Sequence, residues 1–241
     1  MLKEIGSVFS FLTIIPTNNA SLEGTAKYMH IFPLVGIVIG LLIASIGFGL
    51  SLFLDPMIVS LLVVASIAVI TGIHHTDGLA DFADGLMTKG SRSKKLKAMK
   101  DLSTGSAGIV KIVLYAVGAI IALSLTSGFE LFKAILLSEI LAKFSMVLMA
   151  SVGNSAAVGS NSPFMQITKD KRRIAVAGAI TLAPLVFLGG EVGLILFASS
   201  IVVTMLLVGI STKSFGGITG DVLGATNELT RLVSLLIFVS I

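Results

Sequence analysis

Residues 57–85, MIVSLLVVASIAVITGIHHTDGLADFADG, lead from an unbroken apolar run directly into a segment that carries three aspartates. The apolar run is about as long as a membrane-spanning helix needs to be. Asp77, Asp81 and Asp84 follow at i, i+4 and i+7, which places them within a sector of about 60° on one helical face. Such carboxylates repel one another, so the segment favours a bound cation, and Mg²⁺ suits carboxylate oxygens. We therefore predict a metal site where the membrane meets water.

The composition of the whole chain indicates a membrane protein. Of its 241 residues, 55% are hydrophobic and 12% are charged, and the mean hydropathy is +1.03. Soluble domains carry roughly 25% charged residues. The chain has no cysteine, which excludes thiolate metal ligands, and its net charge of +4 is too weak to indicate a nucleic-acid partner. We expect one integral-membrane domain over residues 1–241, with the lipid bilayer as its surroundings.

The predicted fold class is all-α, a polytopic membrane helix bundle with six to seven spans and an interfacial N-terminal helix. The first apolar stretch, Ile5–Ile15, is too short to cross a bilayer, which takes about 20 residues. A break is predicted at Gly189-Gly190, and the last run, to Ile241, is so short that its crossing stays open. The other spans are expected at 31–54, 57–73, 108–127, 131–152, 174–190 and 191–210, with polar segments at 74–107, 153–173 and 211–228.

Basic residues predict the orientation of these spans. They gather in the three polar segments, and two spans separate each segment from the next, so all three segments should face one side. The opposite turns carry Asp55, Glu130 and Glu191, with Lys133 nearby. The positive-inside rule makes the basic side cytoplasmic, and we expect a plasma-membrane protein with its acidic motifs on that side. The basic residues are Lys89, Arg92, Lys94, Lys95, Lys97, Lys100, Lys169, Lys171, Arg172, Arg173 and Lys213.

A second motif, GGITGDVLGATNE at 216–228, surrounds Asp221 and Glu228 with glycines. Glycines beside an acid allow a phosphate or a metal to approach closely, so Gly217, Thr219 and Gly220 are candidate binding residues. The alternative is a flexible, glycine-rich loop between helices.

The stretch KDLSTGSAG at 100–108 also has two interpretations. Lys100, Ser103, Thr104 and the nearby backbone amides could hold a phosphate. Alternatively, Ser103 or Thr104 caps the following span, where Asp101 is also favourable.

Charged and histidine side chains near the membrane give further candidates. Glu139 and Lys143 lie inside the fourth span, where charges are functional candidates by default, although their i, i+4 spacing also permits a simple ion pair. His74 and His75 precede the aspartates. Because Mg²⁺ prefers oxygen, we expect them to hydrogen-bond to phosphate or to face solvent rather than to bind the metal.

On these motifs the chain resembles the cobalamin synthase family, the adenosylcobinamide-GDP ribazoletransferases, along nearly its full length. The aspartate motif together with the Thr-Gly-Asp motif is the specific pair. One departure is Lys143, where the family usually has arginine, and another is Arg231, where it usually has an acid. The matching stretches are FLTIIP at 11–16, FPLVGIVIG at 32–40, HHTDGLADFADG at 74–85, MKDLSTGSAG at 99–108 and GGITGDVLGATNEL at 216–229.

The resemblance implies an Mg²⁺-dependent phosphoryl transfer. A ribose hydroxyl of α-ribazole, or of its 5′-phosphate, attacks adenosylcobinamide-GDP, and GMP leaves while adenosylcobalamin or its phosphate forms. Asp77, Asp81, Asp84 and Asp221 would be the catalytic and metal-binding residues. The implied substrate-binding residues are His74, His75, Lys100, Asp101, Ser103, Thr104, Glu139, Lys143, Gly217, Thr219, Gly220 and Glu228.

Two other functions remain open from the sequence. A CDP-alcohol phosphotransferase also uses intramembrane aspartates, but its pattern needs an arginine where this chain has Ala80-Asp81. A divalent-cation transporter would need acids near the middle of the membrane and a path to both sides. The sequence also leaves open whether a homo-oligomer forms.

Overall fold

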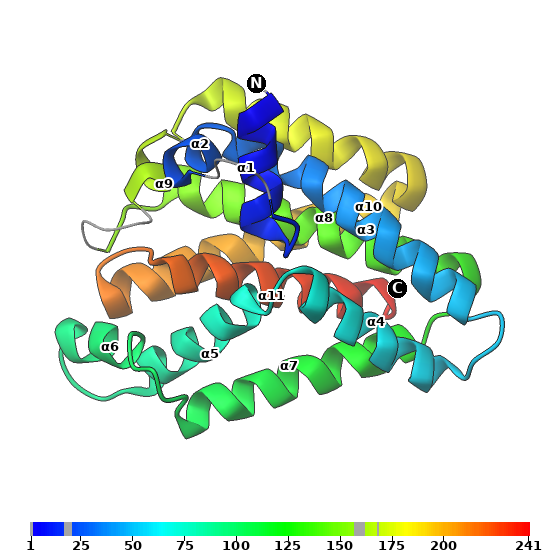
Figure 1. The fold of residues 1–241 in the computed structure, drawn as a ribbon, viewed down its shortest axis with the longest axis horizontal. Helices are drawn as coiled ribbons and strands as arrows, with labels where there is room; N and C mark the ends of the chain where they lie inside the picture. The colour runs from blue at the N-terminus through cyan, green and yellow to red at the C-terminus, as the bar shows by residue number, and fades with distance from the viewer. Residues whose placement is uncertain (1, 17–20, 157–161, 168) are drawn as a thin grey trace.

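The computed structural model describes residues 2–16, 21–156, 162–167 and 169–241, and these ranges form helices with a single isolated backbone bridge, Ser155 to Ile218. Most of the helices run along the long axis of the molecule (Figure 1). The all-α prediction is confirmed. The helices are α1 (Leu2–Leu12), α2 (Leu22–Lys27), η1 (Met29–Ile31), α3 (Phe32–Leu50), α4 (Pro56–Ile70), α5 (His74–Met87), α6 (Arg92–Ala98), α7 (Ser106–Ser124), α8 (Gly128–Val152), α9 (Ser162–Ile167), α10 (Lys171–Phe215) and α11 (Gly220–Phe238).

Several helices are long and apolar enough to cross a membrane. Within the described ranges there are four, namely η1 with α3, α7, α8 and α10, and a fifth if α4 and α5 count as one broken span. A multi-pass bundle is thus confirmed, whereas the predicted number of six to seven spans is not established. The count is lower because α10 is one 45-residue element and α11 carries several charged residues.

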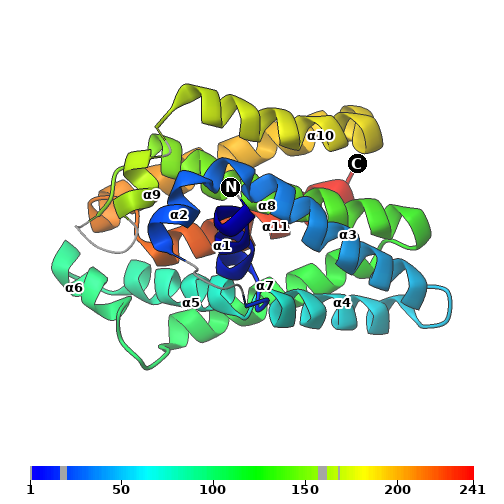
Figure 2. The same cartoon turned by 45° about the horizontal axis from the view of Figure 1, so that its top comes forward.

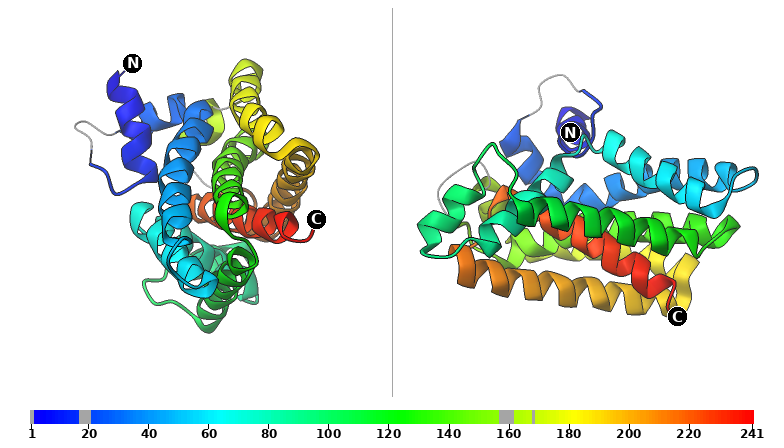
Figure 3. Two further views of the ribbon diagram at one scale, coloured as in Figure 1. Left: turned by 90° about the vertical axis from the view of Figure 1, so that its right-hand side faces the viewer. Right: turned by 90° about the horizontal axis from the view of Figure 1, so that it is seen from below.

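The long helix α10 reverses its direction at Gly190, so that its two arms lie side by side (Figure 3). Gly190 adopts φ 54° and ψ −125°, a conformation that glycine reaches without the strain that a Cβ would cause. The reversal is tight, since a Cβ on Gly193 would lie 2.0 Å from the carbonyl oxygen of Leu185. The predicted break at Gly189-Gly190 is therefore confirmed.

Helix α8 forms the centre of the bundle. Its most apolar stretch is 89% buried, against 28% for α7 and for α10. Figure 2 shows α10 as a layer on one side of α3 and α8, with α4, α5 and α7 on the other side. The outer helices α7 and α10 therefore present apolar side chains outward, as lipid-facing helices do.

Helix α1 runs across the axis of the other helices in Figure 1, and its location at the membrane interface stays a prediction. At one end of the bundle lie α6, α9 and the start of α11, which come from the three predicted polar segments (Figure 1). The shared side of these segments is confirmed as far as the described residues extend. Part of the predicted loop 153–173 lies outside the described residues.

The second acidic motif is not a loop for most of its length. Helix α11 begins at Gly220, and it buries Val222 to Glu228. The cause is a close helix contact, because a Cβ on Gly78 of α5 would lie 3.0 Å from the carbonyl oxygen of Asp221. Gly224 meets the backbone of His75 in the same way, at 3.3 Å. The flexible-loop alternative is therefore wrong for residues 220–228, which form a helix.

Candidate functional site

The three aspartates of α5 lie beside the first turn of α11. Helix α5 starts after a bend of 92°, with both Gly72 and Ile73 at positive φ. Asp77 is exposed, whereas Asp81, Asp84 and Asp221 are partly buried. We call these four residues the carboxylate cluster. None of them forms an ion pair with another described residue, so no direct ion pair offsets the negative charge of the cluster.

Asp81 lies between the other members of the cluster. Burial, together with the charges of Asp77, Asp221 and Asp84, raises its pKa to about 6 from the ordinary value of 3.8. A folded protein that takes up this proton at a higher pH than the unfolded chain is stabilised as the pH falls through that window. At neutral pH, therefore, repulsion between the ionised carboxylates destabilises the metal-free cluster, and other contacts must hold it together.

Asp84 also caps the N-terminus of helix α7. Its Oδ2 accepts a hydrogen bond from the backbone N–H of Gly105 at 2.7 Å, and its Oδ1 accepts one from Gly108 at 2.9 Å. These amides belong to the N-terminus of α7, where a carboxylate is favourable. The expectation that Ser103 or Thr104 caps this helix is wrong, because Asp84 reaches across from α5 to do so.

The cluster fits a magnesium ion by its donor type, since every member offers carboxylate oxygens. Among the described residues, no three histidine or acidic side chains lie close enough together to hold one ion. Mg²⁺ is, however, commonly bound through one or two carboxylates plus substrate phosphates and water. The arrangement therefore suits an ion shared with a phosphate-bearing substrate.

A cavity of about 390 Å³ opens beside the cluster. Asp221 belongs to both, because its charge acts on Asp81 and the residue also lines the cavity. We call this space the α5–α11 cavity. Its lining residues are Ser10, Phe11, Leu22, His74, His75, Met146, Phe164, Gly220, Asp221, Leu223 and Gly224.

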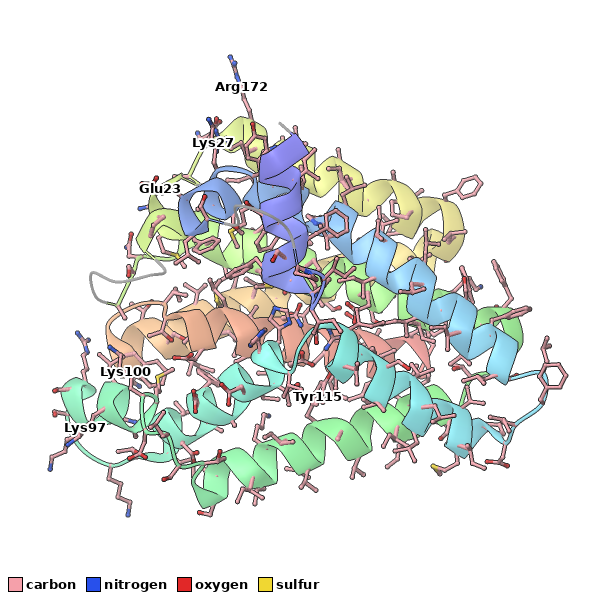
Figure 4. All side chains as sticks on the ribbon, in the orientation of Figure 1. Glu23, Lys27, Lys97, Lys100, Tyr115 and Arg172 are labelled. Atoms are coloured by element: carbon pink, nitrogen blue, oxygen red, sulfur yellow. The ribbon has the colours of Figure 1, made fainter. Side chains whose placement is uncertain are left out.

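Behind the cluster lies a buried ion network between α7, α8 and α11. Lys143 Nζ donates to Asn227 Oδ1 at 2.8 Å and pairs with Glu139 at 3.4 Å. Arg231 pairs with both Glu139 and Glu228 and donates to Tyr115 Oη at 2.7 Å. Figure 4 labels Tyr115 in the middle of the molecule. The network consists of Glu139, Lys143, Asn227, Glu228, Arg231 and Tyr115.

The four charged members of this network are at most 1% exposed. Glu139, Lys143 and Glu228 therefore contact protein groups rather than the open cavity, and their predicted substrate contact stays a prediction. Sequence reasoning missed Arg231 as a site residue. The sequence does contain a pattern that could have indicated it. Arg231 follows Glu228 by three residues, a spacing that allows an ion pair, at the start of an apolar run.

The other predicted binding residues separate into two groups. Lys100, Asp101, Ser103 and Thr104 lie in an exposed loop, in which the Asp101 carboxylate accepts from the backbone of Ser103 at 3.0 Å. Figure 4 shows Lys97 and Lys100 at the end of the bundle where α6 lies. The positive charge of Lys100 acts on the carboxyl group of Asp221.

Two residues before α11, Gly217 and Thr219, contact backbone groups of the protein. Thr219 caps the helix by accepting from the N–H of Val222 at 3.2 Å. Gly217 lies against the backbone of Asn154, where a Cβ would come within 2.5 Å of the carbonyl oxygen. Gly220 differs, since it is exposed and a Cβ there would meet no atom within 4 Å.

Comparison with known proteins gives a consistent result. The family model described as cobalamin-5-phosphate synthase matches residues 4–239. An adenosylcobinamide-GDP ribazoletransferase of Archaeoglobus fulgidus is 34% identical, covering 98% of this chain and 96% of its own. Those of Geotalea daltonii and Methanocella arvoryzae are 34% and 31% identical, covering 100% and 98% of this chain and 98% and 94% of their own. No solved structure matches the chain.

Proposed function

The chain belongs to the cobalamin-5-phosphate synthase family, and from that premise we propose that it joins adenosylcobinamide-GDP to α-ribazole or its 5′-phosphate and releases GMP. Membership makes it a transferase of the last step of cobalamin biosynthesis. The phosphoryl-transfer mechanism, the Mg²⁺ requirement and the residue roles that follow are parts of the proposal.

One observation carries the assignment of the site. Asp221 is shared between the carboxylate cluster and the α5–α11 cavity. A reacting phosphate beside Asp77 and Asp81 would therefore meet a second substrate that enters through the cavity. Phosphoryl transfer needs this adjacency, because the attacking oxygen must come into line with the leaving group.

Different residues of the chain have different roles in the transfer reaction. An oxygen of the α-ribazole ribose forms the new bond to phosphorus, the bond to the GMP oxygen breaks, and the hydroxyl proton passes to the Asp221 carboxylate. Lys100 steadies charge on the phosphates. Asp77 and Asp81, with Asp84, would hold Mg²⁺, which when bound neutralises phosphate charge and stabilises the leaving group. The buried ion network fixes α11 relative to α7 and α8.

We also propose the placement in the membrane. The basic residues of α6 and of the start of α10 share one end with the carboxylate cluster. By the positive-inside rule this end is cytoplasmic, in the plasma membrane. Both arms of α10 would then cross the bilayer separately, which raises the number of spans toward the predicted six to seven.

A turnover assay tests the function. The purified protein is supplied with adenosylcobinamide-GDP, α-ribazole and Mg²⁺, and GMP release is followed with and without a chelator. Asp77→Asn should lower the rate at least 10²-fold, the scale of losing a central electrostatic group. The control is Asp55→Asn, which changes an exposed carboxylate at the start of α4, outside the cluster. Equal rates in the two variants, or no GMP release by the parent protein, contradict the proposal.

A further inference from the structure

The walls of the α5–α11 cavity are mostly apolar and aromatic. Phe11 of α1 and Phe164 of α9 stand together, with ring centroids 5.3 Å apart, and Met146 and Leu223 line other parts. Aromatic and apolar walls of this kind bind flat ring systems by stacking and by exclusion of water. The cavity thus has features that a site for phosphate alone would not need.

Its polar groups are few. His75 is 4% exposed, its buried Nδ1 has no hydrogen-bond partner in the described structure, and the residue lines the cavity. Asp221 lines the cavity as well. A buried polar atom without a partner costs free energy unless a ligand or water supplies the hydrogen bond. This histidine is therefore an observation that points to a ligand.

The charge of the lining excludes one class of occupant. No lysine or arginine is among the described lining residues, whereas Asp221 contributes a carboxyl group. A nucleotide phosphate inside would be repelled by this carboxyl group, and no basic side chain of the described lining would offset the repulsion. The volume of about 390 Å³ also suits a small ligand and is too small for a corrinoid. The cavity favours a neutral nucleoside with an apolar base.

We propose that the α5–α11 cavity is the binding site for the base and ribose of α-ribazole, with the base against Phe11 and Phe164 and a ribose hydroxyl toward Asp221. This inference rests on the proposed function, which supplies α-ribazole as a substrate. A 5′-phosphate on the ribose would lie outside the cavity. His75 would hydrogen-bond to the nucleoside, which satisfies its unpartnered nitrogen.

The leaving GMP is the competing occupant. Guanine offers several donors and acceptors on its edges, and a buried site for it would need matching partners. The polar side chains of the cavity are Ser10, His74, His75 and Asp221, and the carboxylate of Asp221 repels the phosphate of GMP. We therefore place the guanosine nucleotide outside, on the side of the cluster where Lys100 lies.

Gly220 permits a direct test. A Cβ there would meet no protein atom within 4 Å, and Gly220 lines the cavity, so Gly220→Phe should place its ring at the cavity wall without a backbone clash. The matched control is Gly209→Phe on α10, where a Cβ also meets nothing. Because the chain has no tryptophan, the fluorescence of the benzimidazole base reports binding of α-ribazole in detergent.

Gly220→Phe should weaken α-ribazole binding at least tenfold, while Gly209→Phe stays within twofold of the parent protein. Phe164→Ala removes the wall instead of filling the space, and should weaken binding at least threefold. GMP should not displace α-ribazole from the parent protein. In turnover, Gly220→Phe should raise KM for α-ribazole and leave KM for adenosylcobinamide-GDP unchanged.

The outcomes separate this site from the function. Binding that Gly220→Phe abolishes, without GMP release by the parent protein, supports the site and overturns the function. GMP release with α-ribazole affinity and KM unchanged in both Gly220→Phe and Phe164→Ala supports the function and overturns the site. Displacement of α-ribazole by GMP, or no detectable binding of α-ribazole to the parent protein, also overturns the site.

Discussion

Asp84→Asn and Asp81→Asn should change the stability of the protein in different ways, although both remove one carboxylate from the same face of α5. Asp84 accepts hydrogen bonds from Gly105 and Gly108, at 2.7 Å and 2.9 Å. Asp81 accepts none from the described residues, and three carboxylates surround it. The two substitutions are thus matched in chemistry and differ in what the parent side chain contacts.

The size of the Asp84 effect follows from these contacts. Asparagine keeps one acceptor oxygen, so one of the two amides loses its partner, and the negative charge at the N-terminus of α7 disappears. A hydrogen bond to a charged group contributes about 1.5–3 kcal/mol, and charge at a helix terminus about 0.3–1 kcal/mol. Allowing for partial relaxation, we expect a loss of about 2 kcal/mol.

For a chain of this length that loss corresponds to a fall in Tm of roughly 4–8 °C. Asp81→Asn should not lower the Tm of the metal-free protein at neutral pH, because a carboxyl with a pKa of about 6 is destabilised when ionised.

The assay is thermal unfolding in detergent with a chelator present, followed for both variants beside the parent protein. Limited proteolysis of the loop between α6 and α7 gives a local readout, since loss of the Asp84 cap should expose this loop. Equal Tm shifts in the two variants, or an unchanged Tm for Asp84→Asn, would show that the cap contributes nothing and would refute the reasoning.

The remaining predictions concern the buried ion network, the metal and the topology. Lys143→Met should cost about 3–5 kcal/mol in unfolding measurements, because Glu139 loses a buried partner, and adding Glu139→Gln should restore most of it; no loss in the single variant would contradict this. The Mg²⁺ concentration for half-maximal GMP release should rise as the pH falls below about 6, because a proton on Asp81 competes with the metal, and a constant value across that range would contradict it. Cysteines that replace Ser93 and Ser214 should react with a membrane-impermeant thiol reagent from the same side of the membrane. Reaction from opposite sides would refute the prediction that the polar segments share one side.

The sequence predicted those parts of the fold that depend on local pattern. Apolar runs placed α3, α4, α7 and α8 to within a few residues of the observed bounds. The double glycine at 189–190 gave the chain reversal, because glycine alone tolerates that backbone conformation. The i, i+4, i+7 spacing correctly placed the aspartates on one helix.

The parts that failed depend on partners far apart along the chain. Nothing near Asp84 in the sequence shows that it caps a helix through amides 21 and 24 residues away. Arg231 and Tyr115 are 116 residues apart, and their contact appears only when α7 and α11 pack together. The ligand contacts predicted for Gly217 and Gly220 stay predictions, and nothing near Gly224 in the sequence shows that it permits a close approach between two helices.

These long-range contacts explain how the carboxylate cluster can exist at all. Repulsion between Asp81 and Asp221 would separate α5 from α11 if nothing else held the two helices. The Gly78–Gly224 contact packs them backbone to backbone, and a close contact of this kind cannot rearrange gradually. Asp84 ties α5 to α7, and the buried ion network ties α11 to α7 and α8. The carboxylates are therefore held in position by protein contacts alone, so that the Mg²⁺ we propose would relieve their repulsion without reorganising the site.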